Sequence, residues 1–395
     1  MTEARPLLDD AARGSANDVF KSARSFVGLE RKGAEEALSP RGEVPIFNPM
    51  RALTVLPTQP HSARLDEMPE PPLADGELLI EAQAVGVCGT DVEIVRGEYG
   101  EAPPGAQRLI LGHESLGRVL EAPSDSEFAS GDWVVGVVRR PDPVPCPNCA
   151  VGEWDMCRNG RYTERGIKGL HGFASDRYRL PPAFALKLDP RLGELGVLLE
   201  PTSVVAKAWE QVDRIGGRAH WEPRRALVTG AGPVGLLAAL LGVQRGLEVH
   251  VLDRVADGPK PDLVRALGAT YHSGSVGEAG EKWDVVIECT GAGALVLEVI
   301  HRAAPDGVVC LAGVSSTGKR IPVDAGALNR ELVLENNVVF GSVNANLRHY
   351  RQGAEALARA NADWLRRIVT RRVPVDRWQE ALERRPEDVK TVLVW

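Results

Sequence analysis

RALVTGAGPVG, residues 225–235, is the stretch that decides the fold, because an apolar run leads into a turn with the spacing G-x-G-x-x-G. The apolar residues 234–244 predict a helix directly after it, so the turn joins a strand to a helix. In that setting Gly230 permits the tight turn, Gly232 lets the backbone approach a pyrophosphate, and Gly235 lets helix and strand pack closely. The free N–H groups and the positive end of the helix attract phosphates. The stretch therefore predicts a unit that binds a dinucleotide cofactor.

An acidic residue lies where such a unit contacts the adenosine ribose. Asp253 follows the second apolar run, eighteen residues after Gly235, and its carboxylate can accept hydrogen bonds from the ribose hydroxyls, which favours NAD. Arg254 comes next and can pair with a 2′-phosphate, so NADP stays open; the alternative is an arginine that only meets solvent. The cofactor contacts that we predict, besides the three glycines, are Pro233, Val234, Asp253, Arg254, Thr290, Gly291, Leu311, Ala312, Gly313, Gly341, Ser342 and Val343.

Strands and helices alternate after about residue 203. This order is typical of a parallel sheet with helices on both faces, so we predict an α/β, doubly wound cofactor domain over residues 204–343. The strands are expected at 226–229, 248–252, 285–288, 308–312 and 338–343, and the helices at 234–244, 261–267, 294–303 and 328–334.

The rest of the chain predicts a β-rich domain. Strand-like runs at 50–55, 77–87 and 132–138 are separated by Gly- and Pro-rich turns. The chain is expected to be helical again from Leu347 and then to form a strand at 390–395, which needs a partner that the earlier β-rich region can supply. We therefore expect one domain made of residues 50–203 and 344–395, interrupted by the cofactor domain.

Three potential metal ligands lie in glycine-rich turns. Cys88 is in GVCGTD, and His113 and Glu114 follow in GHESLG. A thiolate, an imidazole and a carboxylate are ligands of catalytic zinc, which keeps a fourth position open for water or substrate. A lone Cys or His is more often structural, but the grouping favours a zinc site. Glu200 in LLEPTSVV is the further ligand expected, and Glu114 is expected to bind in some states only.

A second group of cysteines has the spacing of a structural zinc lobe. Cys146 and Cys149 in CPNC are followed by Cys157, so three thiolates are available. The fourth ligand would have to be Asp142, Asp155 or a more distant group. A lobe that folds without metal is the alternative.

Bulk properties exclude several classes of protein. The chain has 395 residues, 54 acidic against 47 basic, and a net charge of -7, which gives no electrostatic footprint for nucleic acid. It has no membrane span and no secretory signal, so we expect a cytoplasmic protein that binds no membrane. The cysteines indicate metal binding in a reducing compartment, and Cys289 and Cys310 are expected to be buried structural thiols. Residues 1–49 lack the apolar residues of a core and are expected to be a mobile extension.

The order of these motifs resembles that of the zinc-dependent medium-chain dehydrogenases, over residues 50–395. More specifically, VRRP at 138–141, YTERGI at 162–167, GLHGF at 169–173 and GSVN at 341–344 are similar to the glucose 1-dehydrogenases of that superfamily. The resemblance implies a GroES-like catalytic domain interrupted by a Rossmann domain.

The resemblance also implies roles for individual residues. The catalytic zinc would be held by Cys88, His113, Glu114 and Glu200, and the hydroxyls of a sugar would be bound by Thr90, Glu164, Glu200 and Asn344. The alternative for Glu164 is a surface charge. Family members with a full structural lobe have four cysteines there, whereas this chain has three. Residues 1–49 have no counterpart in the family.

The implied reaction is zinc-dependent oxidation of an aldose, D-glucose first, at C1 to the lactone with hydride transfer to NAD(P). Thr90, with Glu114 or Glu200, would carry the proton toward solvent. The alternatives are a zinc polyol or alcohol dehydrogenase of the sorbitol or threonine type and a nucleotide-binding relative without turnover. Relatives are commonly dimers or tetramers, so a homodimer or homotetramer is expected.

Overall fold

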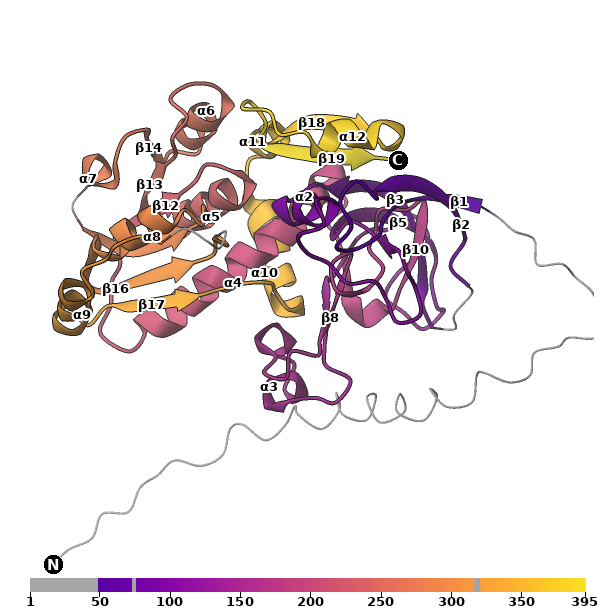
Figure 1. Ribbon diagram of the computed structural model, residues 1–395, viewed down its shortest axis with the longest axis horizontal. Coiled ribbons are helices and arrows are strands. Elements are labelled where there is room, and N and C mark those ends of the chain that lie inside the picture. The colour runs from indigo at the N-terminus through magenta and orange to yellow at the C-terminus, as the bar shows by residue number, and fades with distance from the viewer. Residues whose placement is uncertain (1–48, 73–75, 281, 316–319) are drawn as a thin grey trace, which may run out of the picture. The chain divides into compact units, whose positions relative to one another are not determined.

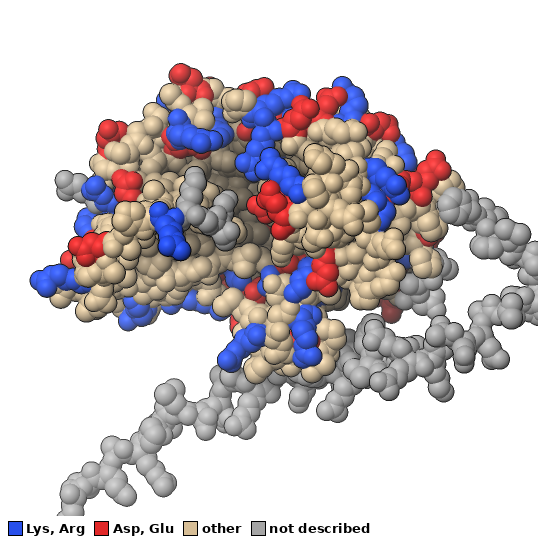
Figure 2. Space-filling view, viewed as in Figure 1, with Lys and Arg blue, Asp and Glu red and all other residues tan. Residues whose placement is uncertain are grey.

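The computed structural model describes residues 49–72, 76–280, 282–315 and 320–395. The extension predicted for residues 1–49 lies outside the described residues, except that Pro49 begins the first strand. None of the described helices is long and apolar enough to cross a membrane. On the face shown in Figure 2, Lys and Arg side chains lie among Asp and Glu side chains.

The dinucleotide motif belongs to a six-stranded parallel sheet, named here the cofactor sheet, with the strand order β14-β13-β12-β15-β16-β17 (Figure 1). The predicted doubly wound α/β fold is thereby confirmed. Its strands are β12 (Arg225–Thr229), β13 (Glu248–Leu252), β14 (Thr270–His272), β15 (Trp283–Glu288), β16 (Ala303–Leu311) and β17 (Val338–Gly341). Its helices are α5 (Pro233–Gln244), α6 (Pro259–Ala266), α7 (Val276–Ala279), α8 (Gly293–Ile300) and α9 (Ala325–Leu334).

This part of the chain differs from the sequence prediction in a few places. The helix predicted at 294–303 is too long, because α8 ends at Ile300 and β16 begins at Ala303. The short elements β14 and α7 were not predicted, since three or four residues carry too little periodicity to be recognised. The long helix α4 (Leu199–Gly216) was also missed, and it packs against α5.

The remaining described strands form three sheets, with the orders β2-β1-β4, β11-β6-β5-β3-β19-β18 with β10 on β3, and β7-β8-β9. The strands are β1 (Pro49–Val55), β2 (Arg64–Pro69), β3 (Leu78–Gly86), β4 (Leu109–Ile110), β5 (Glu114–Glu121), β6 (Trp133–Gly136), β7 (Arg139–Arg140), β8 (Thr163–Arg165), β9 (Gly169–Leu170), β10 (Arg177–Leu180), β11 (Ala185–Lys187), β18 (Val369–Pro374) and β19 (Lys390–Val394). The helices are α2 (Gly89–Val95), α3 (Pro147–Ala150), α10 (Leu347–Arg359), α11 (Ala362–Ile368) and α12 (Trp378–Leu382), and short 3₁₀ helices cover Trp154–Met156, Pro182–Phe184, Gly193–Leu198 and Val375–Arg377.

The strand β19 joins this β-rich region, as predicted. It pairs antiparallel with β3, with Val392 opposite Gly86, and parallel with β18. The expectation that the chain is helical from Leu347 up to this strand is wrong at β18, where the alternating exposure of a sheet strand replaces the helix. Residues from before and after the cofactor sheet therefore share one sheet, whereas the domain boundaries at 203 and 344 stay a prediction.

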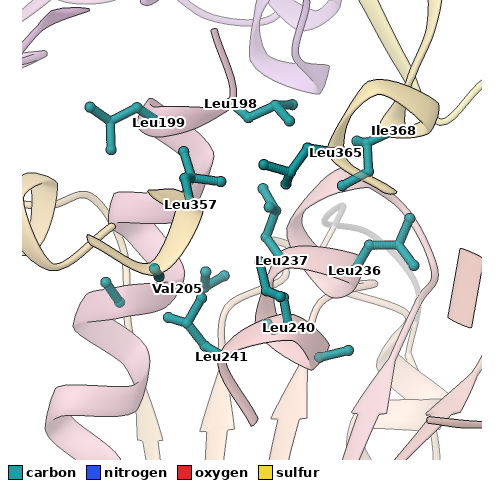
Figure 3. Close-up of a cluster of buried hydrophobic side chains, with 14 of the residues drawn as sticks. Leu198, Leu199, Val205, Leu236, Leu237, Leu240, Leu241, Leu357, Leu365 and Ile368 are labelled. Carbon is teal, nitrogen blue, oxygen red and sulfur yellow. The ribbon is translucent and has the colours of Figure 1, made fainter. Parts of the chain in front are cut away.

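A cluster of buried aliphatic side chains fixes α4 to the cofactor sheet's first helix (Figure 3). Fully burying one such side chain stabilises the fold by about 1.5–3 kcal/mol. The helix α5 begins in the glycine turn, and α4 carries Glu200 in its first turn. The residues of both predicted sites are therefore positioned by the same hydrophobic core. The labelled members are Leu198, Leu199, Val205, Leu236, Leu237, Leu240, Leu241, Leu357, Leu365 and Ile368.

Candidate active site

The three residues first predicted as metal ligands lie together, and we call them the metal cluster: Cys88, His113 and Glu114. Cys88 directly precedes α2, Glu114 is the first residue of β5, and His113 directly precedes that strand. One potential ligand atom from each lies within 4.8 Å of the other two. His113 and Glu114 are buried and Cys88 is partly exposed.

Asp91 orients the metal cluster. Its carboxylate accepts a hydrogen bond from the Cys88 backbone N–H at 2.9 Å, and Oδ1 lies 3.4 Å from His113 Nδ1. Burial would lower the pKa of His113, but the attraction of Asp91 outweighs it and raises that pKa well above 6.5. A carboxylate behind a histidine fixes the ring orientation of a metal ligand and leaves Nε2 for the metal.

Glu114 has a buried cation as its partner. The Lys390 ammonium forms an ion pair with Glu114 Oε2 and donates to the Val87 carbonyl at 2.9 Å, and both charged side chains are almost fully buried. Gly86 leaves room for them, because a Cβ there would lie 2.1 Å from Glu114 Oε2 and would force the ion pair to shift. Glu114 is therefore held in a strong ion pair next to the other two ligands.

Glu200 lies in the first turn of α4 and is 8% exposed. Burial raises its pKa to about 7, His113 acts against this rise, and the negative charge of Glu114 adds to it. Glu200 is thus electrostatically coupled to the metal cluster, although it is not among the three residues grouped within 4.8 Å. Thr90 lies in the first turn of α2, two residues after Cys88.

The residues of this site fit a zinc ion. Thiolate, imidazole and carboxylate are its usual ligands, and each binds in its deprotonated form. In the deprotonated forms that bind a metal, the metal cluster, Asp91 and Glu200 carry four negative charges, and Lys390 supplies one positive charge beside them. A divalent cation suits this excess of negative charge.

Two residues predicted to bind the substrate meet at a buried carboxylate. Glu164 in β8 is 5% exposed and accepts a hydrogen bond from Asn344 Nδ2 at 2.7 Å, across 180 residues of sequence. Arg139 in β7 donates to the same oxygen, Oε1, from Nε at 3.0 Å and from a terminal nitrogen at 2.9 Å. In the part of the chain that the structure describes, these donors all contact Oε1, which leaves Oε2 as an acceptor for a ligand hydroxyl. Glu164 is therefore not the surface charge that was the alternative.

The glycine turn has the geometry of a phosphate-binding turn. Gly230 has φ +88°, and a Cβ on Gly235 would lie 1.8 Å from the Gly230 carbonyl oxygen, so both positions require glycine. No heavy atom among the described residues lies within 4 Å of a Cβ built on Gly232. The backbone at Gly232 therefore faces open space, as approach of a pyrophosphate needs.

Asp253 lies beside this turn, directly after β13. Its Oδ2 accepts a hydrogen bond from the Ala231 N–H at 2.7 Å, its Oδ1 accepts one from the Val255 N–H at 3.2 Å, and Lys260 Nζ lies 3.6 Å away. Arg254 is exposed. The ribose contact of Asp253 and the phosphate contact of Arg254 stay predictions.

The other predicted cofactor residues follow β15, β16 and β17. The buried Glu288 at the end of β15 accepts hydrogen bonds from the Thr290 N–H at 2.7 Å and from the Gly291 N–H at 3.1 Å. A Cβ on Gly313 would lie 2.2 Å from the Gly291 nitrogen, so the two loops touch through their backbones. Because carboxyl ends of parallel strands meet at one edge, the remaining residues share this edge with the glycine turn: Leu311, Ala312, Gly341, Ser342 and Val343.

The predicted cysteine lobe, residues 146–157, also brings its thiols together. Cys146, Cys149 and Cys157 have Sγ atoms within 4.8 Å of one another, which fits a zinc ion held by three thiolates. Backbone N–H groups of Arg158 and Cys149 donate to Cys146 Sγ and lower its pKa to about 6.

Neither proposed fourth ligand joins this group of thiols. Asp142 accepts a hydrogen bond from the Val144 N–H and pairs with Arg161. Asp155 uses both carboxylate oxygens, on Lys207 and Asn346. Among the other thiols, Cys310 is fully buried, as predicted, and Cys289 is only partly buried.

Sequence reasoning missed three residues of the site. Asp91 and Arg139 lie inside two motifs used for the prediction, GVCGTD and VRRP. Both are charged residues within these motifs to which the prediction gave no role, and this could have drawn attention to them. Lys390 gave no signal, because its partner Glu114 belongs to a distant strand.

Comparison with known proteins supports the assignment along the chain. The family model "Glucose dehydrogenase C-terminus" matches residues 193–394, and "Alcohol dehydrogenase GroES-like domain" matches residues 74–190. Glucose 1-dehydrogenase 1 of Caldivirga maquilingensis is 41% identical over 350 residues, which is 87% of this chain and 98% of that protein. Glucose 1-dehydrogenase of Thermoproteus tenax is 41% identical over 351 residues, with 87% and 99% covered.

A solved structure agrees with these relatives. Glucose dehydrogenase of Haloferax mediterranei, in complex with NADP, Zn and gluconolactone, superposes with a TM-score of 0.81 at 32% identity and covers 87% of this chain and 99% of its own. Its fold supports the GroES-like and parallel-sheet parts expected from the motifs. With two family models and full-length relatives in agreement, this chain belongs to the glucose 1-dehydrogenases of the zinc-dependent medium-chain dehydrogenase superfamily.

Proposed function

We propose that this protein oxidises an aldose, D-glucose first, at C1 to the lactone, with hydride transfer to NAD or NADP. The observation that carries the proposal is the contact between Glu164 and Asn344, which presents a carboxylate and an amide for binding several hydroxyls. The relatives named glucose 1-dehydrogenase and the neighbour that holds NADP, Zn and gluconolactone support the same substrate and cofactor class.

Cys88 and His113 hold zinc in this proposal, with Glu200 as a further ligand. The chemistry that zinc supplies in such a site is Lewis-acid polarisation of the substrate oxygen, which lowers the pKa of a bound hydroxyl. Asp91 keeps the imidazole of His113 oriented, and Lys390 balances the charge of Glu114.

The proton of the C1 hydroxyl leaves through residues of this chain. Thr90 lies beside Cys88 and carries the proton from the substrate toward a carboxylate. Glu200 is the carboxylate suited to receive the proton, at the stage at which it is not a zinc ligand, because Glu114 is already paired with Lys390. NAD(P) would supply the hydride acceptor for C1. The backbone around Gly291 and Gly313 would hold the cofactor, in a loop that the Glu288 carboxylate fixes.

The test is a panel that follows NAD(P)H absorbance with glucose, galactose, xylose, sorbitol and ethanol, each with NAD and NADP. We expect kcat/KM for at least one aldose to exceed that for sorbitol and ethanol by about 100-fold or more, because buried groups built for sugar hydroxyls are left unsatisfied by ligands that lack them. Turnover confined to sorbitol or simple alcohols would instead indicate a polyol or alcohol dehydrogenase. Binding of NADH without turnover on any of these would indicate a relative that has lost catalysis.

We also propose a homo-oligomer in the cytoplasm. β17 is the last strand of the cofactor sheet, and Val333, Leu334 and Val343 nearby are more than half exposed, so this edge suits a second copy of the chain. Light scattering should give a mass of two or four chains. The grouped free thiols of the protein suit a reducing compartment. Cell fractionation can test the cytoplasmic location.

A further inference from the structure

A buried ion pair links the cysteine lobe to α4, outside the metal cluster. Lys207 Nζ lies 3.0 Å from Asp155 Oδ2, and the two side chains are 2% and 0% exposed. Asp155 is in the 3₁₀ helix just before Cys157, and Lys207 lies near the middle of α4. The reaction described above uses neither residue.

Stability is a weak reason for such a pair. Removing two charges from water costs free energy that their attraction does not reliably repay, and apolar side chains of similar volume often replace a buried ion pair without loss. The contacts around the pair therefore need another explanation.

On the side of Asp155, the contacts lead to the substrate carboxylate. The Asp155 backbone carbonyl accepts a hydrogen bond from Arg139 at 3.1 Å, and the same guanidinium donates to Glu164 Oε1 from its other nitrogens. Lys207 Nζ also donates to this carbonyl at 3.3 Å. The pair thus fixes the segment that holds Arg139, and through it the orientation of the Glu164 carboxylate.

On the other side, the pair holds one residue before Asn344 and one residue after it. Lys207 donates to the Val343 carbonyl at 3.0 Å, and Asp155 Oδ1 accepts a hydrogen bond from Asn346 Nδ2 at 2.7 Å. Asn344 itself has φ +62°, a left-handed conformation that is uncommon outside glycine and that asparagine tolerates better than most residues. The two bonds fix the backbone on each side of this residue and so set where its amide points.

We propose that Asp155 and Lys207 are positioning residues for sugar recognition, which hold Glu164 and Asn344 in their binding geometry without touching the substrate. The inference rests on the proposed function. A displacement of about 1 Å in such a site can reduce catalytic efficiency about 100-fold, so breaking the pair should raise the KM for the sugar at least about tenfold. The catalytic zinc content should change less than about twofold, because the pair contacts none of its predicted ligands. The KM for the cofactor should change less than the KM for the sugar, since the pair touches one predicted cofactor residue only, through the Val343 carbonyl.

The test uses the full-length protein and variants of nearly constant shape. Asp155→Asn and Lys207→Met each break the pair, and the double variant removes both charges. Asn346→Ser keeps an oxygen that can cap α10, where Asn346 accepts from the Arg348 N–H, but it removes the amide donor to Asp155. Asp66→Asn is the matched control, since it breaks an Asp–Arg pair of 3.1 Å that connects to Thr54 and not to the substrate residues.

Steady-state kinetics with glucose and with the cofactor, metal analysis and thermal unfolding decide the outcome. We expect a raised sugar KM in the two single variants, a smaller rise in Asn346→Ser, and wild-type values in Asp66→Asn. If a single variant fails to fold, the double variant and Asn346→Ser carry the test, because removing both charges leaves no unpaired buried charge. Sugar KM values within twofold of wild type in every folded variant would overturn the inference. Wild-type protein that turns over no aldose would remove the proposed function, and this inference with it.

Discussion

The metal cluster and the cysteine lobe are two candidate metal sites with opposite construction. The metal cluster combines three kinds of ligand and depends on the buried charges of Asp91 and Lys390. The lobe uses one kind of ligand, supplied by residues 146–157, with backbone N–H groups on its thiols. The metal cluster can keep a coordination position open for substrate, and the charges around it come from distant parts of the chain. The thiolates of the lobe all come from one short loop, which a metal would hold closed. The two should therefore respond differently to loss of a ligand.

The largest effect is expected from Cys88→Ser. A serine hydroxyl is a poor zinc ligand, and Lewis-acid stabilisation amounts to several kcal/mol, so kcat/KM for glucose should fall about 1,000-fold or more. Metal analysis should find one zinc fewer per chain. If this variant retains its metal and stays within tenfold of wild-type activity, Cys88 is not a ligand of the catalytic zinc.

Next comes Lys390→Met, which tests the buried charges around the metal cluster. The change leaves Glu114 as a buried charge without its partner, which should destabilise the fold by about 3–5 kcal/mol. The double variant Glu114→Gln with Lys390→Met should recover much of this loss, since neither charge remains. Urea unfolding measures both values, and equal stabilities for the single and double variants would show that the ion pair does not carry the effect.

The smallest effect is expected from Cys149→Ser in the lobe. Loss of one thiolate should destabilise the protein by about 2 kcal/mol and lower the Tm by about 4 °C or more, while kcat stays within about twofold. Calorimetry and kinetics on the same sample measure the two quantities. A drop in kcat as large as that of Cys88→Ser would abolish the distinction between the two sites. Zinc content, compared with the wild type, shows whether the lobe binds metal.

Local sequence patterns were enough to predict much of the fold. The glycine turn at 230–235 combines a strand, a turn and a helix within one short stretch, and the structure has β12 and α5 in these places. The metal cluster was also predictable, because Cys88 and His113 occur in unusual glycine-rich turns. In both cases neighbouring residues determine the geometry.

Features that depend on distant pairing could not be predicted. α4 was missed, and its main partner besides α5 is α10, which follows much later in the sequence. The partners of Glu114, Asp155 and Glu164 are Lys390, Lys207 and Arg139, and nothing near any of these carboxylates indicates which cation it will meet. β18 was taken for helix because its role as a strand depends on β19 beside it.

The strand β19 has a consequence for the order of folding. Lys390, which it contributes to the metal cluster, is 303 residues along the chain from its hydrogen-bond partner Val87. The cofactor sheet, in contrast, is built from one continuous segment and can form while the chain emerges from the ribosome. Contacts between such distant residues form late, because the intervening chain must first be ordered. The dinucleotide-binding half should therefore be folded before the zinc pocket gains its internal counterion.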